Sequence, residues 1–254
     1  MTLPRDLASR AMALGLAAHV VEVGGSSVQS ALLGENASVT FTDGPLTETA
    51  PGLFGLTAPG LVINGRVWGA TQVGWDDVDA WRELGYRRPP DVSMNDAEAA
   101  ALGEWLLRGE RRPSSLLYAG LGTGLGGAMI SDGEIVPVDL SHQRGYGDAV
   151  CDGCGAGCLN AQIGGQYLPR FLGEGDKRRV VGLLATGIRR AGVPAGTVVV
   201  LAGGLVRRSH PELLPALRGR LRGVFPVEGS AAPDAAKSAA YVGVFDRLAA
   251  TAGQ

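Results

Sequence analysis

The chain has 254 residues, of which 45% are hydrophobic and 19% are charged, and its formal net charge is -2. This balance is typical of a folded protein with a sizeable core, and it argues against a nucleic-acid surface, which needs a basic excess. No run approaches the roughly 20 apolar residues of a membrane-spanning helix, and the three cysteines offer no disulfide framework. We therefore expect a cytoplasmic protein that binds neither nucleic acid nor membrane.

The predicted elements begin with strands and continue as strands and helices in alternation. Strands are predicted at 20–23, 27–33, 37–41, 53–56, 61–63, 115–119, 125–130, 134–138 and 197–201. Helices are predicted at 96–108, 159–171, 177–191, 210–221 and 235–249. Asn95 is placed to cap the first helix, and Glu98 adds an acid to its first turn, where the helix dipole favours negative charge. This order predicts two α/β lobes, 1–112 and 113–254.

All three cysteines lie within eight residues, at Cys151, Cys154 and Cys158, and His142 lies just upstream. The glycines between them loosen the segment, so that three thiolates and one imidazole can close around a single ion. Tetrahedral zinc prefers this donor set, and the simpler alternative is a group of unpaired thiols in a flexible loop. Because four protein ligands leave no open position for water, we expect a structural zinc site and not the site of a zinc hydrolase.

Three glycine-rich turns, 22–27, 121–127 and 201–204, each follow a predicted strand. Glycine lets backbone amides crowd against an anion, and Ser or Thr hydroxyls add donors. Any one of these turns is explained more simply as a hairpin turn. None has the Lys-Ser/Thr ending of a Walker motif, and the second lacks the Rossmann spacing and precedes a strand. As a set, they favour a nucleotide held between two lobes.

The order of these motifs resembles the ROK family of sugar kinases and related repressors. The turn at 22–26 stands where the family has its first phosphate loop, and Ala58-Pro59-Gly60 matches its Pro-Gly turn near the sugar. The segment 95–100 is similar to the family's Asn-Asp-Ala-Asn-Ala-Ala signature. The turn at 122–127 resembles the second phosphate loop, and Gly203-Gly204 resembles the adenosine-side loop. The segment 139–142, with the cysteines after it, is similar to the zinc signature.

The resemblance implies an α/β fold of the two-lobed ribonuclease H-like kind found in actin and hexokinase, with nucleotide and sugar in the interlobe cleft, and a homodimer. It implies an ATP-dependent kinase that phosphorylates a hydroxyl of a hexose, an N-acetylhexosamine or a sugar-like cyclitol by in-line transfer, with Asp96 as general base. The expected substrate contacts are Gly60, Asn95, Asp139, His142 and Asn160. The expected ATP contacts are Gly24, Gly25, Ser26, Gly122, Thr123, Gly124, Gly203 and Gly204.

The same resemblance implies two metals. His142, Cys151, Cys154 and Cys158 are expected to hold structural Zn²⁺, with the second nitrogen of His142 turned to a sugar hydroxyl. Glu22 is expected to face Mg²⁺ through water.

Three residues depart from the family's pattern. Glu22 replaces an Asp, Asp139 replaces a sugar-binding Glu, and Asn160 stands where the family has another sugar-contacting Glu. Charge-assisted hydrogen bonds are roughly twice as strong as neutral ones, so the loss of a carboxylate alters sugar binding and makes a modified sugar or a cyclitol a rival to glucose. The cysteine spacing also differs, and the segment 42–52 has no room for the helix expected there.

The alternative to a kinase is a non-catalytic sugar-binding or regulatory protein of the same fold. Family repressors carry an N-terminal helix-turn-helix, and the roughly 19 residues before the first predicted strand cannot hold one. We therefore expect no DNA-binding domain. Asn95-Asp96 and both phosphate turns are present, which favours an active kinase.

Overall fold

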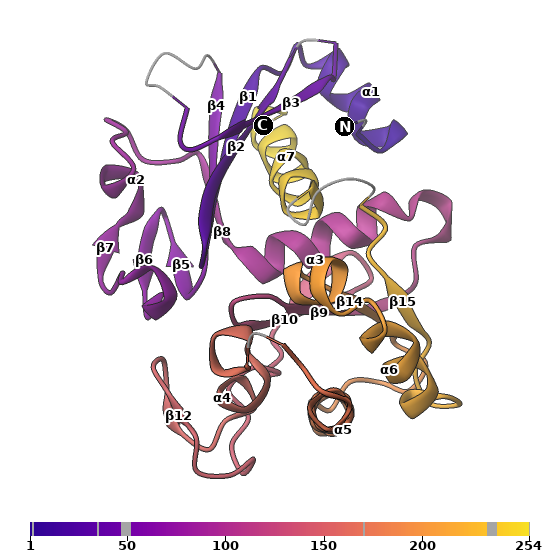
Figure 1. The fold of residues 1–254 in the computed structure, drawn as a ribbon. Coiled ribbons are helices and arrows are strands. Elements are labelled where there is room, and N and C mark those ends of the chain that lie inside the picture. Colours follow the sequence, from indigo (N-terminus) through magenta and orange to yellow (C-terminus); the bar gives the residue numbers. More distant parts are fainter. Residues whose placement is uncertain (2, 35, 47–51, 170, 233–237, 254) are drawn as a thin grey trace. The chain divides into compact units, whose positions relative to one another are not determined.

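The computed structural model describes residues 1, 3–34, 36–46, 52–169, 171–232 and 238–253 (Figure 1). The chain forms two compact units, Met1–Arg112 with Ala231–Gln254 and Pro113–Ser230. The predicted second lobe, 113–254, differs from this division at its end. The reason is that helix α7 (Ser238–Ala252) packs on α3 (Asp96–Leu107) and on the strands of the first unit.

The first unit is built on a five-stranded sheet in the order β3-β2-β1-β4-β8. Its strands are β1 (Ala18–Gly24), β2 (Ser27–Leu33), β3 (Val39–Asp43), β4 (Leu53–Ala58) and β8 (Val92–Asn95). The first three strands run antiparallel, whereas β4 is parallel to β1 and β8 is parallel to β4. Strand β1 is buried along nearly all of its length. Its sequence is mostly apolar, as is typical of a strand covered on both faces, with His19 and Glu22 as the exceptions.

Each face of this sheet is covered by a different set of elements. Helices α3 and α7 cover one face, and a side chain at Gly55 of β4 would lie 2.4 Å from Val244 of α7. The other face packs against residues of β6 (Arg66–Trp68) and α2 (Ala80–Glu83). There β6 forms a small antiparallel sheet with β5 (Leu61–Ile63) and β7 (Val78–Asp79). At the N-terminus, α1 (Arg5–Ala13) contacts α7 through an ion pair between Arg10 and Asp246.

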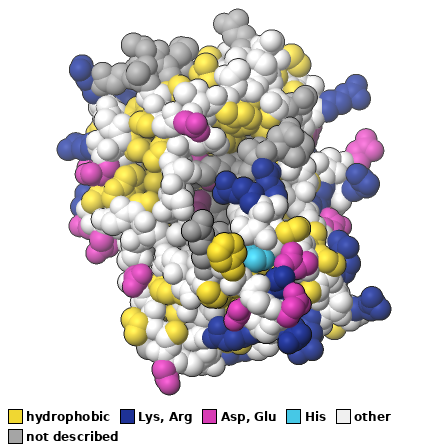
Figure 2. Space-filling model, in the orientation of Figure 1, with side chains coloured by type: hydrophobic (Ala, Val, Ile, Leu, Met, Phe, Trp, Pro, Cys, Tyr) yellow, Lys and Arg dark blue, Asp and Glu magenta, His cyan; other side chains and the backbone are white. Residues whose placement is uncertain are grey.

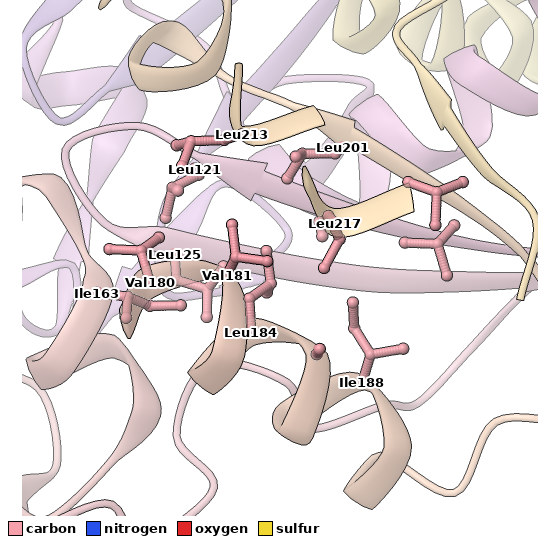
Figure 3. Packing of buried hydrophobic residues seen from close by; sticks show 14 of the residues in the cluster. Leu121, Leu125, Ile163, Val180, Val181, Leu184, Ile188, Leu201, Leu213 and Leu217 are labelled. Atoms are coloured by element: carbon pink, nitrogen blue, oxygen red, sulfur yellow. The ribbon is translucent and has the colours of Figure 1, made fainter. Parts of the chain in front are cut away.

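The second unit repeats the same strand plan, in the order β11-β10-β9-β14-β15. Its strands are β9 (Ser115–Leu121), β10 (Leu125–Ser131), β11 (Glu134–Val136), β14 (Val198–Ala202) and β15 (Val227–Gly229). Again three antiparallel strands are followed by two parallel ones. The core on one face is formed with the helices α4 (Leu159–Ile163), α5 (Glu174–Arg190) and α6 (Leu213–Leu221). Side chains that meet in this core (Figure 3) include Leu121, Leu125, Ile163, Val180, Val181, Leu184, Ile188, Leu201, Leu213 and Leu217.

Several predicted elements are confirmed, and β2 and β5 have the predicted bounds. The helix predicted at 159–171 is wrong, because α4 ends at Ile163 and a 3-10 turn, η3 (Gly165–Tyr167), follows Gly164. Helix α6 begins three residues after its predicted start, beyond the π-helical turn η4 (Leu205–Ser209). The predicted start of the last helix, at 235, and part of the shortened segment 42–52 lie outside the described residues.

Elements without a strong local signal went unpredicted, namely α1, α2, β6, β7, β8, β15, the short pair β12 (Val150–Cys151) and β13 (Gly155–Ala156), and the 3-10 turns η1 (Thr71–Val73) and η2 (Gly109–Arg111). Among the described residues, none of the helices is both long enough and apolar enough to cross a bilayer. In Figure 2, acidic and basic side chains are interspersed over the visible face, in agreement with the small net charge.

Helices α3 and α7 approach so closely that their contact requires glycine. A Cβ atom at Gly103 would lie 1.7 Å from the carbonyl oxygen of Ala239, and one at Gly243 would lie 2.2 Å from that of Ala99. Both distances are far inside van der Waals contact with backbone atoms, which cannot move without shifting a helix. These two glycines therefore set the spacing of the helix pair.

We predict that Gly103→Ala lowers the free energy of unfolding by about 1–3 kcal/mol, because overpacking outweighs the gain in helix propensity. The matched control is Gly182→Ala in α5, where a Cβ atom would meet nothing within 4 Å. It should raise stability by up to about 1 kcal/mol. Urea unfolding of both variants measures the difference, and equal effects would contradict the close packing.

Candidate active site and metal centre

The predicted site residues of the first unit gather at one edge of its sheet. Because β1, β4 and β8 are parallel neighbours, their carboxyl ends lie at the same edge, where ligands bind in open α/β sheets. The turn Gly25-Ser26 follows β1, and Gly60 follows β4. Asn95 ends β8, and Asp96 begins α3. Gly25 and Ser26 form the two-residue turn of the β1–β2 hairpin, since Gly24 pairs with Ser27.

Asn95 joins two of these segments. Its Oδ1 accepts from the backbone N–H groups of Ala97 (2.9 Å) and Glu98 (3.3 Å), so it caps α3 as predicted. Its Nδ2 donates to the carbonyl of Gly60 at 2.9 Å. Gly60 has φ +83°, and a Cβ atom there would lie 2.3 Å from the carbonyl oxygen of Trp68. The Pro-Gly turn and the start of α3 are therefore held together through one amide.

Asp96 and Glu22 occupy different environments at this edge. Asp96 is the first residue of α3 and half-buried, and its Oδ1 accepts from the N–H of Ala97 at 2.9 Å. The helix N-terminus stabilises its negative charge. Glu22 is buried in β1 beside Thr57 of β4. Burial, with the nearby charges of Glu22 and Asp43, raises the pKa of Tyr241 in α7 well above its usual value.

The second unit brings two more predicted turns together. The phosphate turn, as we name residues Gly122–Gly124, joins β9 to β10, and the N–H of Gly122 donates to the carbonyl of Gly124 at 2.9 Å. Gly203-Gly204 follows β14, the parallel neighbour of β9. A Cβ atom at Gly122 would lie 4.0 Å from the N of Gly204. At Gly203, with φ +100°, it would lie 2.4 Å from the carbonyl oxygen of Leu121, so the approach requires glycine.

The structure also brings together the four predicted zinc ligands, which we call the metal cluster: His142, Cys151, Cys154 and Cys158. Their ligand atoms all lie within 4.8 Å of one another. Nδ1 of His142 lies 3.2 Å from Sγ of Cys154 and 3.8 Å from Sγ of Cys151. Ligands of tetrahedral zinc with ordinary bond lengths stand about 3.5–3.8 Å apart. The donor set and its spacing therefore fit Zn²⁺, and Nδ1 is the imidazole nitrogen that faces the thiols.

The thiols of the cluster and their neighbours shift one another's pKa values. Burial raises the pKa of Cys151, but hydrogen bonds from the Asn160 amide and from backbone N–H groups lower it by more, to about 6. Burial and the two neighbouring thiols raise the pKa of Cys154 to about 12. Metal ligation requires the cysteines as thiolates, so a bound dication would have to overcome the raised pKa of Cys154.

The loop that carries His142 is shaped by Asp139 and Gln143. Oδ1 of Asp139 accepts from the backbone N–H of His142 at 2.9 Å. Nε2 of Gln143 donates to the carbonyl of Asp139 (2.7 Å) and to that of Gly187 in α5 (3.0 Å). Asp139 is exposed. Sequence reasoning missed Gln143, since a single glutamine in a polar loop carries no distinguishing pattern.

Asn160 lies in α4 and is only 3% exposed. Its Oδ1 accepts from the N–H of Leu125 at 2.8 Å, and its Nδ2 donates to Sγ of Cys151 at 3.5 Å. The sugar contact expected of Asn160 stays a prediction, while both polar atoms of its side chain already bind protein groups. Sequence reasoning also missed that the N–H groups of Gly165 and Gln166 hold the phosphate turn, although Gly164-Gly165 was a visible signal of close approach.

Comparison with known proteins identifies the family of the chain. A model of the ROK family matches residues 21–176, which include Asp96, the phosphate turn and the metal cluster. The chain belongs to the ROK family. The resemblance seen in the sequence motifs is thereby confirmed.

Glucokinases are among the curated relatives of this ROK protein. The glucokinase of Streptomyces coelicolor is 27% identical over 181 residues, which cover 59% of this chain and 57% of that protein. The glucokinase of Halalkalibacterium halodurans is 31% identical over 153 residues, which cover 55% of this chain and 46% of that protein. The chain thus spans about half the length of the curated relatives it matches.

Solved structures match over a larger part of the chain. A ROK family glucokinase from Streptomyces griseus, in complex with glucose and AMPPNP, has a TM-score of 0.71 at 18% identity and covers 91% of this chain and 98% of its own. An inorganic polyphosphate/ATP-glucomannokinase from Arthrobacter sp. strain KM has a TM-score of 0.64 at 23% identity and covers 93% and 99%. These likenesses confirm the predicted fold class, that of actin and hexokinase.

We predict that the protein binds about one Zn²⁺ per chain and that Cys154→Ser reduces this content while lowering the melting temperature. Loss of a thiolate opens the tetrahedron, and a ligand at a hundredfold excess over its Kd contributes about 2.7 kcal/mol to stability. Metal analysis and thermal melts with and without a chelator measure both effects. Asp148→Asn, an exposed carboxylate in the same loop, should leave the zinc content unchanged; zinc-free protein from zinc-supplemented cells would contradict the site.

Proposed function

We propose that the protein is an ATP-dependent kinase that phosphorylates a hydroxyl group of a sugar or a sugar-like polyol. The observation that carries the proposal is Asp96, a half-buried carboxylate at the first residue of α3, directly beside the cap that holds the Pro-Gly turn. Membership of the ROK family and the two hairpin turns at equivalent places in the two sheets support it.

In this proposal, Asp96 is the general base. The oxygen of a sugar hydroxyl attacks the γ-phosphorus in line, its proton passes to the carboxylate of Asp96, and the bond to the bridging oxygen breaks to release ADP. The helix N-terminus favours a negative charge at Asp96, and its position at the start of α3 makes it suitable as the base. No other residue at the carboxyl edge of the first sheet combines a carboxylate with a helix start among the described residues.

The backbone amides of the glycine turns would bind the nucleotide. The hairpin at 24–26 and the phosphate turn offer N–H groups, with the hydroxyls of Ser26 and Thr123 as further donors to phosphate oxygens. Gly203 and Gly204, beside the phosphate turn, would allow the adenosine to approach closely. Glu22 offers a carboxylate, the kind of donor that Mg²⁺ prefers, and the ion would neutralise phosphate charge.

Each unit offers candidate contacts to the sugar. From the first, Asn95 has one amide hydrogen beyond its bond to Gly60, and the Pro-Gly turn lies beside it. From the second, we assign the exposed Asp139 and the imidazole nitrogen of His142 that faces away from the thiols. The acceptor class that we propose is a hexose, an N-acetylhexosamine or a cyclitol. Asp139, shorter than the family's Glu, would determine which of them binds.

We predict that ATP-Mg²⁺ with the right member of a panel of hexoses, N-acetylhexosamines and C7-cyclitols releases ADP, and that Asp96→Asn slows this turnover by about 10²–10⁴-fold. Loss of the base removes the proton acceptor while leaving the shape of the side chain unchanged. The matched control is Glu98→Gln, which removes a carboxylate from the same helix turn and should leave the rate within about threefold.

A rate for Asp96→Asn close to that of the wild type would remove Asp96 from the mechanism. If no member of the panel causes ADP release but calorimetry detects sugar binding, the non-catalytic sugar-binding alternative is favoured instead.

A further inference from the structure

A short segment of the second unit contacts both the metal cluster and the phosphate turn. This segment, residues 158–168, comprises α4 and η3, and we call it the bridge. It begins at Cys158, which is itself a member of the cluster and caps α4 by accepting from the N–H of Ala161 at 3.4 Å. The bridge is therefore attached to the metal site by its first residue.

Three hydrogen bonds join the bridge to the phosphate turn and to Leu125, the residue that follows the turn. The N–H of Leu125 donates to Oδ1 of Asn160 at 2.8 Å. The N–H groups of Gly165 and Gln166 donate to the carbonyls of Gly122 (3.0 Å) and Thr123 (2.7 Å). A Cβ atom at Gly165 would lie 2.2 Å from the carbonyl oxygen of Gly122, so the two backbone segments are in direct contact. The shape of the turn thus depends on where the bridge lies.

The bridge also contacts Cys151 of the cluster and Asp152, the residue after it. Nδ2 of Asn160 donates to Sγ of Cys151 at 3.5 Å, and the hydroxyl of Tyr167 accepts from the N–H of Asp152 at 3.0 Å. The side chain of Asn160 connects the two sites: its Oδ1 accepts from Leu125, directly after the phosphate turn, and its Nδ2 donates to the metal ligand Cys151. Leu125 N–H can only donate, so this contact fixes which end of the amide faces which neighbour.

We propose that Asn160 is a positioning residue that couples metal occupancy of the cluster to the shape of the phosphate turn, and through it to nucleotide affinity. The link to nucleotide rests on the proposed function, whereas the link to the turn does not. A metal-bound thiolate at Cys151 is a strong acceptor for the amide, since hydrogen bonds to charged groups are shorter and stronger. That bond orients the amide, and the oriented amide holds Leu125 at the start of β10.

The coupling also gives a physical reason for Asn at this position. A carboxylate there would accept from Leu125 N–H equally well, but it has no hydrogen to donate to sulfur. It would also add negative charge beside the thiolates of the cluster. The amide is the side chain of this size that satisfies both neighbours.

The test compares zinc-loaded and zinc-stripped protein in two measurements. One is the amide exchange rate of Leu125 by NMR, with Leu117 of β9 as an internal reference for the integrity of the sheet. The other is the Kd of AMPPNP by calorimetry. In the wild type, zinc removal should speed exchange at Leu125 by about tenfold or more with Leu117 unchanged, and should weaken AMPPNP binding by about fivefold or more.

Asn160→Asp separates the two contacts, because it keeps the acceptor for Leu125 and loses the donor to Cys151. In this variant zinc should dissociate faster, and its removal should change each measurement by less than about twofold. The matched control is Gln162→Glu, which adds the same charge to the same helix, where the side chain contacts Arg179. It should retain the wild-type response to zinc.

If the amide exchange rate of Leu125 in the wild type does not change on zinc removal, the coupling is overturned, and that measurement needs no variant. A wild-type response in Asn160→Asp, or a parallel loss of protection at Leu117, would also overturn it. If AMPPNP binds to no form while Leu125 still responds to zinc, the proposed nucleotide site fails and the coupling stands.

Discussion

The parallel pairing of the central strands is the constraint on which the site depends. In each unit, the strand that opens the antiparallel part also has a parallel neighbour on its other side, β4 beside β1 and β14 beside β9. Parallel strands end at the same edge, so residues far apart in the chain become neighbours there. Asp96 follows Glu22 by more than seventy positions, yet both belong to the carboxyl edge of one sheet.

In each unit, backbone approaches backbone at some positions more closely than a side chain allows. Gly60, Gly203 and Gly165 each place their α-carbon where a Cβ atom would overlap a carbonyl oxygen. Glycine at these positions therefore permits short distances between backbone segments, in addition to backbone angles that other residues rarely adopt. In the second unit, hydrogen bonds of the bridge connect the metal cluster to the phosphate turn and to Leu125 after it.

Much of this was predictable from local sequence. Three predictions rest on short-range signals: the cap at Asn95, the cysteine cluster and the glycine turns. In the structure, Asn95 caps α3, the cysteines lie together with His142, and the first glycine turn joins β1 to β2. What escaped prediction depends on contacts between distant segments. The segment after Leu159 has helical periodicity, but the helix ends at Ile163 and the chain then contacts the phosphate turn through Gly165. The assignment of α7 to the first unit rests on Gly103 and Gly243, whose partners no local pattern reveals. The role of Asn160 emerges only when Leu125 and Cys151 are seen on either side of it.

The return of α7 to the first unit has a consequence for biosynthesis. The second unit is one continuous stretch, 113–230, whereas the first unit lacks a covering helix until residues 238–252 leave the ribosome. At usual rates of translation, this delay is on the order of ten seconds. During that time the face of the first sheet around Gly55 is without α7, and α3 is without its partner. The first unit can therefore complete its fold only after the whole of the second unit has been synthesised.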